Sequence, residues 1–409
     1  MLASRLGRDA RVLSLVGSGH FLSHFYNLTL PPLLPLLKTE FDASYAALGL
    51  AMTCFYAASG IVQVPVGFLV DRIGGRLVLI AGLMVEAGAI GLISLAQSIE
   101  ALIIFAFLAG LGHSVFHPCD YAIINSSVDE RRMARAFSIH TFCGHLGSAM
   151  APAVMIFLAA LVDWRAALVM VSSVGIVVAI IILFQGDVLR DDAPVPEKFE
   201  KKKEEPPAGS AQAGSMAQGI RFLLSGPMLL FFLFYVMTSM TSSGMNTFSV
   251  TAVVSLFDTP LTAANTGLTG FLFASAIGVL FGGLILDRTS RHNLVAAGAF
   301  FLTAVLITII GSVALPSVLL IVLFTLAGLS QGVVRPARDM LLRAAAPRGM
   351  IAKSFGFVST GMAAGGMLAP VLFGWLIDIG LPQAVFWALA AIMLAAVFIA
   401  LVPFAKKHA

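Results

Sequence analysis

Long apolar runs recur along the whole chain, and they restrict its possible folds more than any other feature. A helix needs about 20 apolar residues to cross the hydrocarbon core of a bilayer, which is about 30 Å thick. Hydrophobic residues make up 59% of the 409 residues and charged residues only 11%, whereas soluble domains carry about 25% charged residues. Barrel strands alternate over about ten residues and do not fit such continuous runs. The sequence therefore predicts an all-α membrane protein with twelve transmembrane helices, over residues 13–37, 45–70, 77–96, 100–124, 133–159, 165–185, 227–255, 264–286, 294–314, 317–342, 352–379 and 382–404.

A polar segment divides these runs into two sets of six. Residues 186–219 are rich in charge, Pro, Gly and Ala, which is typical of flexible linkers. We expect an N-terminal six-helix bundle over 1–185, a cytoplasmic linker over 186–220 and a C-terminal six-helix bundle over 221–409. Parallel repeats of this kind are typical of transporters that hold their substrate between two bundles near the middle of the membrane. The halves carry matching motifs at a nearly constant offset: Asp71-Arg72 with Asp287-Arg288, His117-Pro118 with Arg335-Pro336, and Ala151-Pro152 with Ala369-Pro370.

The positive charges lie almost entirely on one side of the predicted spans. Basic residues cluster before the first span, in alternate loops and after the last span, whereas the other side offers little beyond Lys38 and Arg165. This positive-inside pattern places both termini in the cytoplasm and accounts for the net charge of +4 without a nucleic-acid partner. The three cysteines fall inside spans, so we expect free thiols.

A ten-residue loop, GFLVDRIGGR at residues 67–76, follows the second predicted span. It resembles the cytoplasmic motif of the major facilitator superfamily, Gly-x-x-x-Asp-Arg-x-Gly-x-Arg/Lys. The resemblance implies the major facilitator fold, with two pseudo-symmetric bundles, and a loop that latches the bundles while the inner side is closed. Gly67 is predicted to allow close helix packing, and the alternative is a solvated turn whose charges only set topology. The expected gating residues are Gly67, Asp71, Arg72, Arg76, Asp287 and Arg288.

A narrower resemblance covers residues 19–37 and 110–118, GHFLSHFYNLTLPPLLPLL and GLGHSVFHP. These stretches are similar to the fosmidomycin-resistance type of facilitator, which implies proton-driven export of small drugs. Two departures leave the proton carrier and the substrate open. His24 stands where that family has an acidic residue, and Cys119-Asp120 follow the His-Pro step where that family has Glu.

Six of the eight histidines fall in predicted spans of the N-terminal half. Residues at i, i+4 and i+7 share a helix face, and Pro118 is expected to kink its helix. At 1.5 Å per residue, His24 lies about 18 Å from the cytoplasmic end of its span. Two sets show the shared-face spacing: His113, His117 and Asp120, and His20, His24 and Asn27.

We predict that His24, His117 and Asp120 carry a coupling proton. Polar groups inside a membrane usually face a cavity or the protein interior, and histidine titrates near neutral pH. The resemblance implies that the first and fourth spans line the central cavity. Two alternatives stay open: the histidines are interhelical hydrogen-bonding groups, or His113, His117 and Asp120 coordinate zinc. We expect no metal, because no carboxylate second shell is visible.

Three other polar groups in the N-terminal half are expected to serve packing. His140 and His145 are separated by about 140° around a helix, so at most one faces the cavity. Gly144 and Ser148 on the same helix have the small-xxx-small spacing of close contacts. Glu86 lies near the middle of the third span with no charge within one turn. It is either buried in its protonated form or a second proton site, and because the third span is often peripheral in the superfamily that the sequence resembles, we expect a structural or interfacial role.

The second half suggests an anionic substrate. Gln331, Arg335 and Arg338 share a helix face, and arginine binds carboxylate or phosphonate groups in a bidentate manner. The alternative is that Arg335 or Arg338 neutralises Asp120 or Asp339 at a gate. The predicted substrate-binding residues are His20, Asn27, Tyr56, Gln63, His113, Thr241, Asn246, Gln331, Arg335 and Arg338.

The sequence therefore predicts a secondary transporter of the inner membrane. It moves a small organic anion by alternating access, coupled to protons. Export by antiport is favoured through the fosmidomycin-type resemblance, and uptake of a carboxylate-type nutrient by symport is the rival. We expect no enzymatic activity and no cofactor, and a monomer whose partners are solute, protons and lipid. An intramembrane metal enzyme and a transporter-like sensor are the other classes considered.

Overall fold

The computed structural model describes residues 2–128, 132–189, 221–286, 288–345 and 351–402. Within these ranges every regular element is a helix. Shorter pieces, η1 (Pro31–Leu33), α2 (Leu34–Phe41) and η3 (Gly186–Val188), accompany the long helices. The long helices are α1 (Leu2–Asn27), α3 (Tyr45–Ile73), α4 (Gly75–Ile93), α5 (Ile99–His113), α6 (Phe116–Ser127), α7 (Met133–Leu161), α8 (Trp164–Gln185), α10 (Gly226–Phe257), α11 (Leu261–Leu286), α12 (His292–Ser312), α13 (Ser317–Ala345), α14 (Ile351–Asp378) and α15 (Pro382–Leu401).

Eleven spans in the described part of the chain are long and apolar enough to cross a membrane, with α5 and α6 counted as one span. They correspond to eleven of the twelve predicted runs. The remaining run, 13–37, is only partly covered by α1, whose sequence carries arginines near its start and two histidines and an asparagine near its end. The chain is therefore a multi-pass membrane protein, and its first span is polar for a reason given below.

Two predicted spans are broken, and proline sets both breaks. Proline lacks an N–H group, and its ring clashes with the carbonyl four residues earlier. Helix α1 ends at Asn27, four residues before Pro31, so the expectation of one continuous helix over 13–37 was wrong. Helix α5 ends at His113 and α6 begins at Phe116, which puts the break at the residue four before Pro118. The kink predicted for Pro118 is confirmed.

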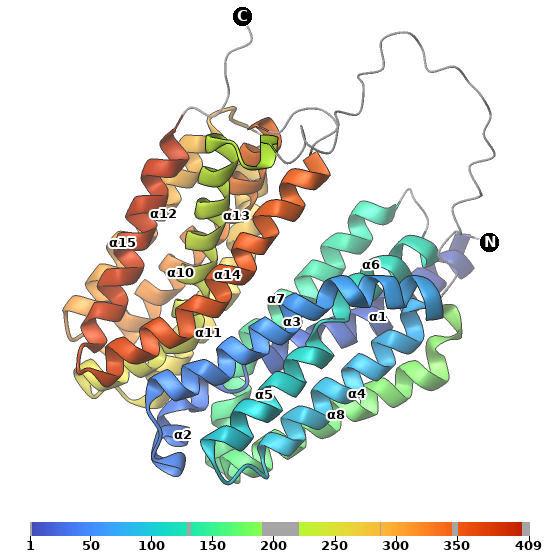
Figure 1. The fold of residues 1–409 in the computed structure, drawn as a ribbon, viewed down its shortest axis with the longest axis horizontal. Coiled ribbons are helices and arrows are strands. Elements are labelled where there is room, and N and C mark those ends of the chain that lie inside the picture. Colours follow the sequence, from blue (N-terminus) through green and yellow to red (C-terminus); the bar gives the residue numbers. More distant parts are fainter. Residues whose placement is uncertain (1, 129–131, 190–220, 287, 346–350, 403–409) are drawn as a thin grey trace, which may run out of the picture.

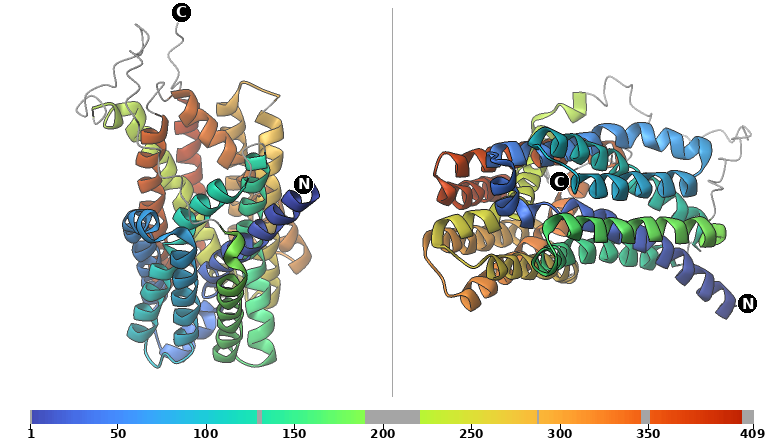
Figure 2. Two further views of the ribbon diagram at one scale, coloured as in Figure 1. Left: turned by 90° about the vertical axis from the view of Figure 1, so that its right-hand side faces the viewer. Right: turned by 90° about the horizontal axis from the view of Figure 1, so that it is seen from below.

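The helices form two groups (Figure 1). The N-terminal half contains α1 to α8 and the C-terminal half contains α10 to α15, and Figure 2 shows the same groups from two further directions. Equivalent helices pair in each half: α1 packs on α7 as α10 packs on α14, α3 on α5 as α11 on α13, and α4 on α8 as α12 on α15. The halves meet through α3 with α14 and α7 with α11. The matching pairs agree with the repeat seen in the sequence.

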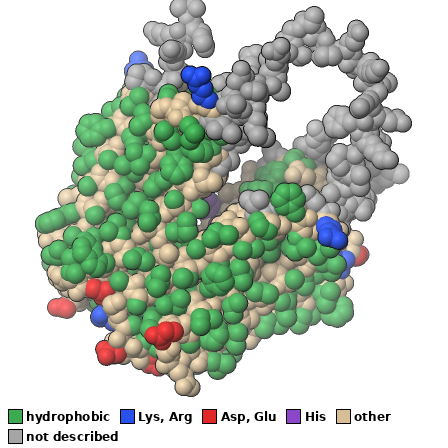
Figure 3. All heavy atoms as spheres, in the orientation of Figure 1, with side chains coloured by type: hydrophobic (Ala, Val, Ile, Leu, Met, Phe, Trp, Pro, Cys, Tyr) green, Lys and Arg blue, Asp and Glu red, His purple; other side chains and the backbone are tan. Residues whose placement is uncertain are grey.

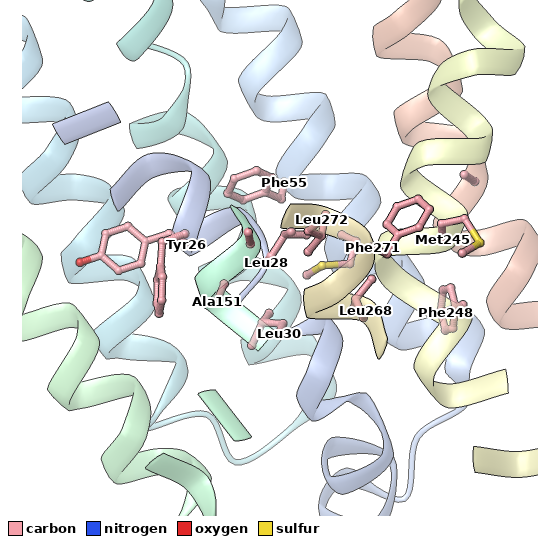
Figure 4. Close-up of a cluster of buried hydrophobic side chains, with 14 of the residues drawn as sticks. Tyr26, Leu28, Leu30, Phe55, Ala151, Met245, Phe248, Leu268, Phe271 and Leu272 are labelled. Carbon is pink, nitrogen blue, oxygen red and sulfur yellow. The ribbon is translucent and has the colours of Figure 1, made fainter. Parts of the chain in front are cut away.

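The halves are closed against each other at one face only. We call the end where α8 finishes and α10 begins the linker face. The closed face lies opposite to it, and we call it the far face. Apolar side chains of both halves gather toward it, among them Leu28, Leu30, Phe248 and Phe271 (Figure 4). Toward the linker face the halves diverge, and a hollow with histidine side chains in it lies between them (Figure 3).

A carboxylate of one half caps a helix of the other at the far face. Asp378, at the end of α14, accepts hydrogen bonds from the backbone N–H groups of Tyr45 and Ala46, each at 2.7 Å. Lys38 lies 3.8 Å from the same carboxylate. A negative charge at a helix N-terminus is favourable because the first N–H groups lack partners inside the helix. This cap fixes the start of α3 against α14.

The motif at the end of α3 lies on the open side. A Cβ atom on Gly67 would meet nothing within 4 Å, so the prediction that Gly67 allows close helix packing is wrong in this conformation. The physical reason is that the halves diverge here. Arg76 donates to the Leu183 carbonyl at 2.6 Å and joins α4 to α8 within one half, while Arg72 and Arg288 are exposed. Asp287, the side chain of Asp71 and most of the predicted linker lie outside the described residues.

Candidate functional site

A buried aspartate forms the centre of the polar site. Asp120 on α6 has 0% relative exposure. His140 Nε2 of α7 hydrogen-bonds to its Oδ2 atom at 2.9 Å, and His20 Nδ1 of α1 lies 2.9 Å from the same oxygen. The two imidazole rings stack at 3.7 Å between centroids, and Asp120 Oδ1 has no hydrogen-bond partner among the described groups. A carboxylate removed from water needs such partners, because an isolated buried charge is very costly.

Further imidazoles surround this centre. The His24 ring lies 4.6 Å from the His20 ring, and the His117 ring lies 5.5 Å from it. The His113 ring lies 6.4 Å from the His24 ring. Together these side chains connect α1, α5, α6 and α7, and they explain why α1 is polar for a span. We call the set of His20, His24, His113, His117 and His140 the histidine cluster.

Gly144 of α7 makes room for the cluster. A Cβ atom at this position would lie 2.7 Å from His20 Nε2 and 3.0 Å from His24 Cδ2. Three residues on, a Cβ on Gly147 would collide with the backbone carbonyl of Phe21. The close contacts predicted from small-residue spacing are therefore confirmed for α7 against α1. They bring the histidines of α1 next to those of α7.

Gly144→Ala is expected to displace the His20 ring and, if the chain is the transporter that its sequence predicts, to slow transport several-fold. Overpacking of this kind costs about 1–3 kcal/mol, and some of it will appear as a lower melting temperature. The control is Gly88→Ala on α4, where a Cβ would meet nothing within 4 Å. Transport rates in proteoliposomes and thermal melting of both variants would check this, and equal rates in the two would contradict it.

A second carboxylate–histidine pair lies deeper in the N-terminal half. Glu86 of α4 has 0% relative exposure, and its Oε1 atom lies 3.0 Å from His113 Nδ1. His113 was predicted to bind substrate, but its Nδ1 atom is used by this pair. His20, also predicted to bind substrate, is 3% exposed and directed at Asp120. Both histidines therefore contact carboxylates inside the N-terminal half.

The two arginines of α13 have different surroundings. Arg338 contacts Asp339 at 2.9 Å and lies over the Tyr235 ring at 3.9 Å. The Tyr235 hydroxyl donates to Asp339 at 2.8 Å. Of the two roles considered for Arg338, the structure has it neutralising Asp339. Arg335 is half-buried and has no hydrogen bond or ion pair with any described residue, and it lies close enough to His145 of α7 for their charges to interact.

The other predicted substrate-binding residues differ in how far they are buried. Tyr56 of α3 interacts with the Asn27 and Ser243 side chains, which joins the two halves. Gln331 donates to Ser242 at 3.0 Å and leaves its Oε1 atom without a partner. Thr241 is completely buried, and its hydroxyl donates to the Thr238 carbonyl, so it is not available to a solute in this conformation. The remaining two, Gln63 and Asn246, are half-buried.

Sequence reasoning missed His140 and His145 as site residues. Their five-residue spacing correctly separates them: His140 is 2% exposed beside Asp120, whereas His145 is half-buried and near Arg335. The helix was assigned to packing because nothing in the sequence gives its rotation against α1. The available signal was the concentration of histidines in one half.

One group in the described part of the chain has the spacing for a metal ion. The ligand atoms of His20, Asp120 and His140 lie within 4.8 Å of one another. This differs from the His113, His117 and Asp120 set considered above. His140 hydrogen-bonds to Asp120 Oδ2, whereas His20 Nδ1 lies 2.9 Å from the same oxygen without hydrogen-bond geometry. A proton on either imidazole can pair with this carboxylate.

Comparison with known families fits this geometry. The family model of the Major Facilitator Superfamily matches residues 16–260 and 235–408. The chain belongs to the Major Facilitator Superfamily. It is thus a transporter by family and fold, and the resemblance of the loop at 67–76 was a correct guide.

Individual relatives of this superfamily member are distant. The fosmidomycin resistance protein of Escherichia coli (strain K12) is 28% identical over 141 residues, 34% of this chain and 34% of that protein. The probable L-galactonate transporter of the same strain is 24% identical over 144 residues, 35% of this chain and 32% of that protein. The matched stretch therefore spans about a third of the length of each relative. The crystal structure of the nucleoside transporter NupG has a TM-score of 0.75 at 14% identity, covering 98% of this chain and 100% of that one, which shows the fold alone.

Proposed function

We propose that this transporter moves a small organic anion across the inner membrane in exchange for protons. The linker face is assigned to the cytoplasm, because the basic loops lie there and positive loops stay inside. Export by antiport is the favoured direction. One distant relative is named for fosmidomycin resistance, and another is named as a probable L-galactonate transporter, which supports an anionic solute.

The observation that carries this proposal is the guanidinium of Arg335, which has no hydrogen bond or ion pair among the described residues and interacts with Asp339 only at longer range. A half-buried charge of this kind is costly, whereas the neighbouring Arg338 contacts both Asp339 and Tyr235. Arginine presents a planar fork that matches carboxylate and phosphonate groups. An anionic solute between the halves would supply the missing partner and would lie between Arg335 and His145.

The coupling proton is assigned to the cluster around Asp120. Histidine exchanges protons near neutral pH, and His24 and His117 are half-buried, next to the fully buried His20. A proton on this cluster neutralises Asp120 and changes the charge that the solute meets. Because solute and proton then favour different conformations, each biases the alternation of the two halves.

Arg335→Gln is expected to lower solute transport at least tenfold, because the anion loses its charged partner; a factor of ten is about 1.4 kcal/mol. Arg335→Lys should keep part of the activity, since charge remains but the bidentate geometry is lost. The measurement is uptake of labelled phosphonates and carboxylates into proteoliposomes that contain a pH-sensitive dye. Arg291→Gln, at an exposed arginine preceding α12, is the matched control.

The sign of the dye signal separates the two directions. Protons that move opposite to the solute support antiport, and protons that move with it support uptake by symport. Solute uptake without any proton movement would overturn the coupling, and full transport of anions by Arg335→Gln would overturn the anionic substrate.

A further inference from the structure

We infer that Glu86, paired with His113, is a second proton-binding site of the transporter. It is joined to Asp120 through the histidine cluster, so that the N-terminal half exchanges two protons in each cycle. This inference rests on the proposed function, because it deepens the proton coupling of the same cluster. The sequence left a second proton site open for Glu86 and favoured a structural role, and the contact with His113 reverses that preference.

The environment of Glu86 fits a proton site better than a packing contact. The carboxyl is completely buried, and only Oε1 has a partner, His113 at 3.0 Å. Oε2 has no hydrogen-bond partner among the described groups. Two titratable side chains interact with it, His113 from α5 and Tyr26 from α1, and the Tyr26 hydroxyl already donates to the Val171 carbonyl at 2.8 Å. A buried carboxyl without a cation is stable only when a proton lies on it or on its histidine.

The packing of α4 keeps this site dry. A Cβ on Gly112 of α5 would collide with the backbone nitrogen of Glu86, so the two helices touch at this level. From the other side, Ser172 of α8 donates to the Ala87 carbonyl at 2.7 Å. Neither helix offers an ion-pair partner to Glu86 other than His113 among the described residues.

The histidines provide a route between the two carboxyls. The centroid of the His113 imidazole lies 6.4 Å from that of His24, and the His24 centroid lies 4.6 Å from that of His20. His20 Nδ1 in turn lies 2.9 Å from Asp120. Each imidazole can accept a proton on one nitrogen and release one from the other. Ring rotation, or one water between neighbours, closes the remaining gaps. A proton that leaves Glu86 passes to His113 and on to His24, which is half-buried.

Charge balance sets the number of protons. The histidine cluster contacts two carboxyls, Asp120 and Glu86, and the arginines of α13 belong to the other half. With every histidine neutral, the site carries two negative charges in a low-dielectric interior, which is unfavourable. It is neutral when it holds two protons, one on the Asp120 side and one on the Glu86 side.

Glu86→Gln tests the inference, because it keeps the shape and removes the proton site. The ratio of protons to solute, measured from the dye signal and labelled solute together, is expected to fall about twofold, from the count of carboxyls that neutralise the site. Glu100→Gln, an exposed glutamate on α5, should leave the ratio unchanged. An unchanged ratio in Glu86→Gln, with wild-type proton movement intact, overturns the second site and leaves the proposed function standing.

Infrared difference spectroscopy of the purified protein gives a readout that needs no transport. Wild type is expected to show a protonated carboxyl stretch that disappears as pH rises and is absent in Glu86→Gln. His113→Gln should shift that stretch, because it removes the partner of Oε1. If wild-type vesicles show no proton movement, the proposed coupling fails, and a stretch that does not depend on pH would then overturn the second site as well.

Discussion

Asp120→Asn is expected to abolish proton-driven accumulation of solute while exchange of solute across the membrane continues. The amide cannot bind a proton, and it removes the negative charge that both His20 and His140 contact through a single carboxylate oxygen, Oδ2. Because accumulation needs the proton and exchange does not, the driven rate should fall at least tenfold, about 1.4 kcal/mol of coupling, while the exchange rate changes little. The two rates are measured as uphill accumulation under a pH gradient and as counterflow of labelled solute.

The control for this substitution is Asp42→Asn. Asp42 is exposed and adopts a left-handed backbone conformation with φ of 46°, which asparagine also tolerates. Its transport should match wild type. If Asp120→Asn retains full accumulation, then Asp120 and its histidines hold helices together and do not carry the coupling proton.

The sequence was sufficient for most of the spans and for the kink at Pro118, because apolar length identifies a membrane helix and a proline weakens the hydrogen bonds before it. It missed the break before Pro31, and prolines such as Pro65 and Pro152 lie inside unbroken helices, so a proline alone does not show where a helix ends. The expected shared face of His113, His117 and Asp120 was a weaker inference. The break before Phe116 separates His113 from the other two, and His113 contacts Glu86 while Asp120 contacts His20 and His140.

Partners on other helices were beyond the reach of the sequence. Spacing places Arg335 and Arg338 on one face of α13 and gives no reason to distinguish them. The distinction comes from Tyr235 of α10, which lies under Arg338 and hydrogen-bonds to Asp339. Likewise, the stacking of the His140 ring on the His20 ring beside Asp120 depends on how closely α7 approaches α1, and that approach is set by Gly144 and Gly147.

Gly49→Ala is expected to keep the far face from closing and to reduce transport at least tenfold. A Cβ on Gly49 of α3 would collide with the Pro370 carbonyl of α14, and one on Gly374 would collide with the Tyr45 carbonyl. Thr53 donates to the Met367 carbonyl at 2.6 Å along the same contact. Since the collision involves backbone, no side chain can move aside, and overpacking costs of about 1–3 kcal/mol fall on this closed state alone.

Labelling at the far face measures the shift directly. Leu268 of α11 is completely buried in the apolar cluster there, so a thiol placed by Leu268→Cys should react slowly in wild type and several-fold faster with Gly49→Ala. Gly60→Ala is the matched control, because its Cβ would lie at an ordinary 3.6 Å from Ala363 Cβ on the same pair of helices. If both variants label and transport alike, the contact between α3 and α14 relaxes without cost. Closure of the far face would then depend on the cap that Asp378 places on α3, and Asp378→Asn would be the variant that opens it.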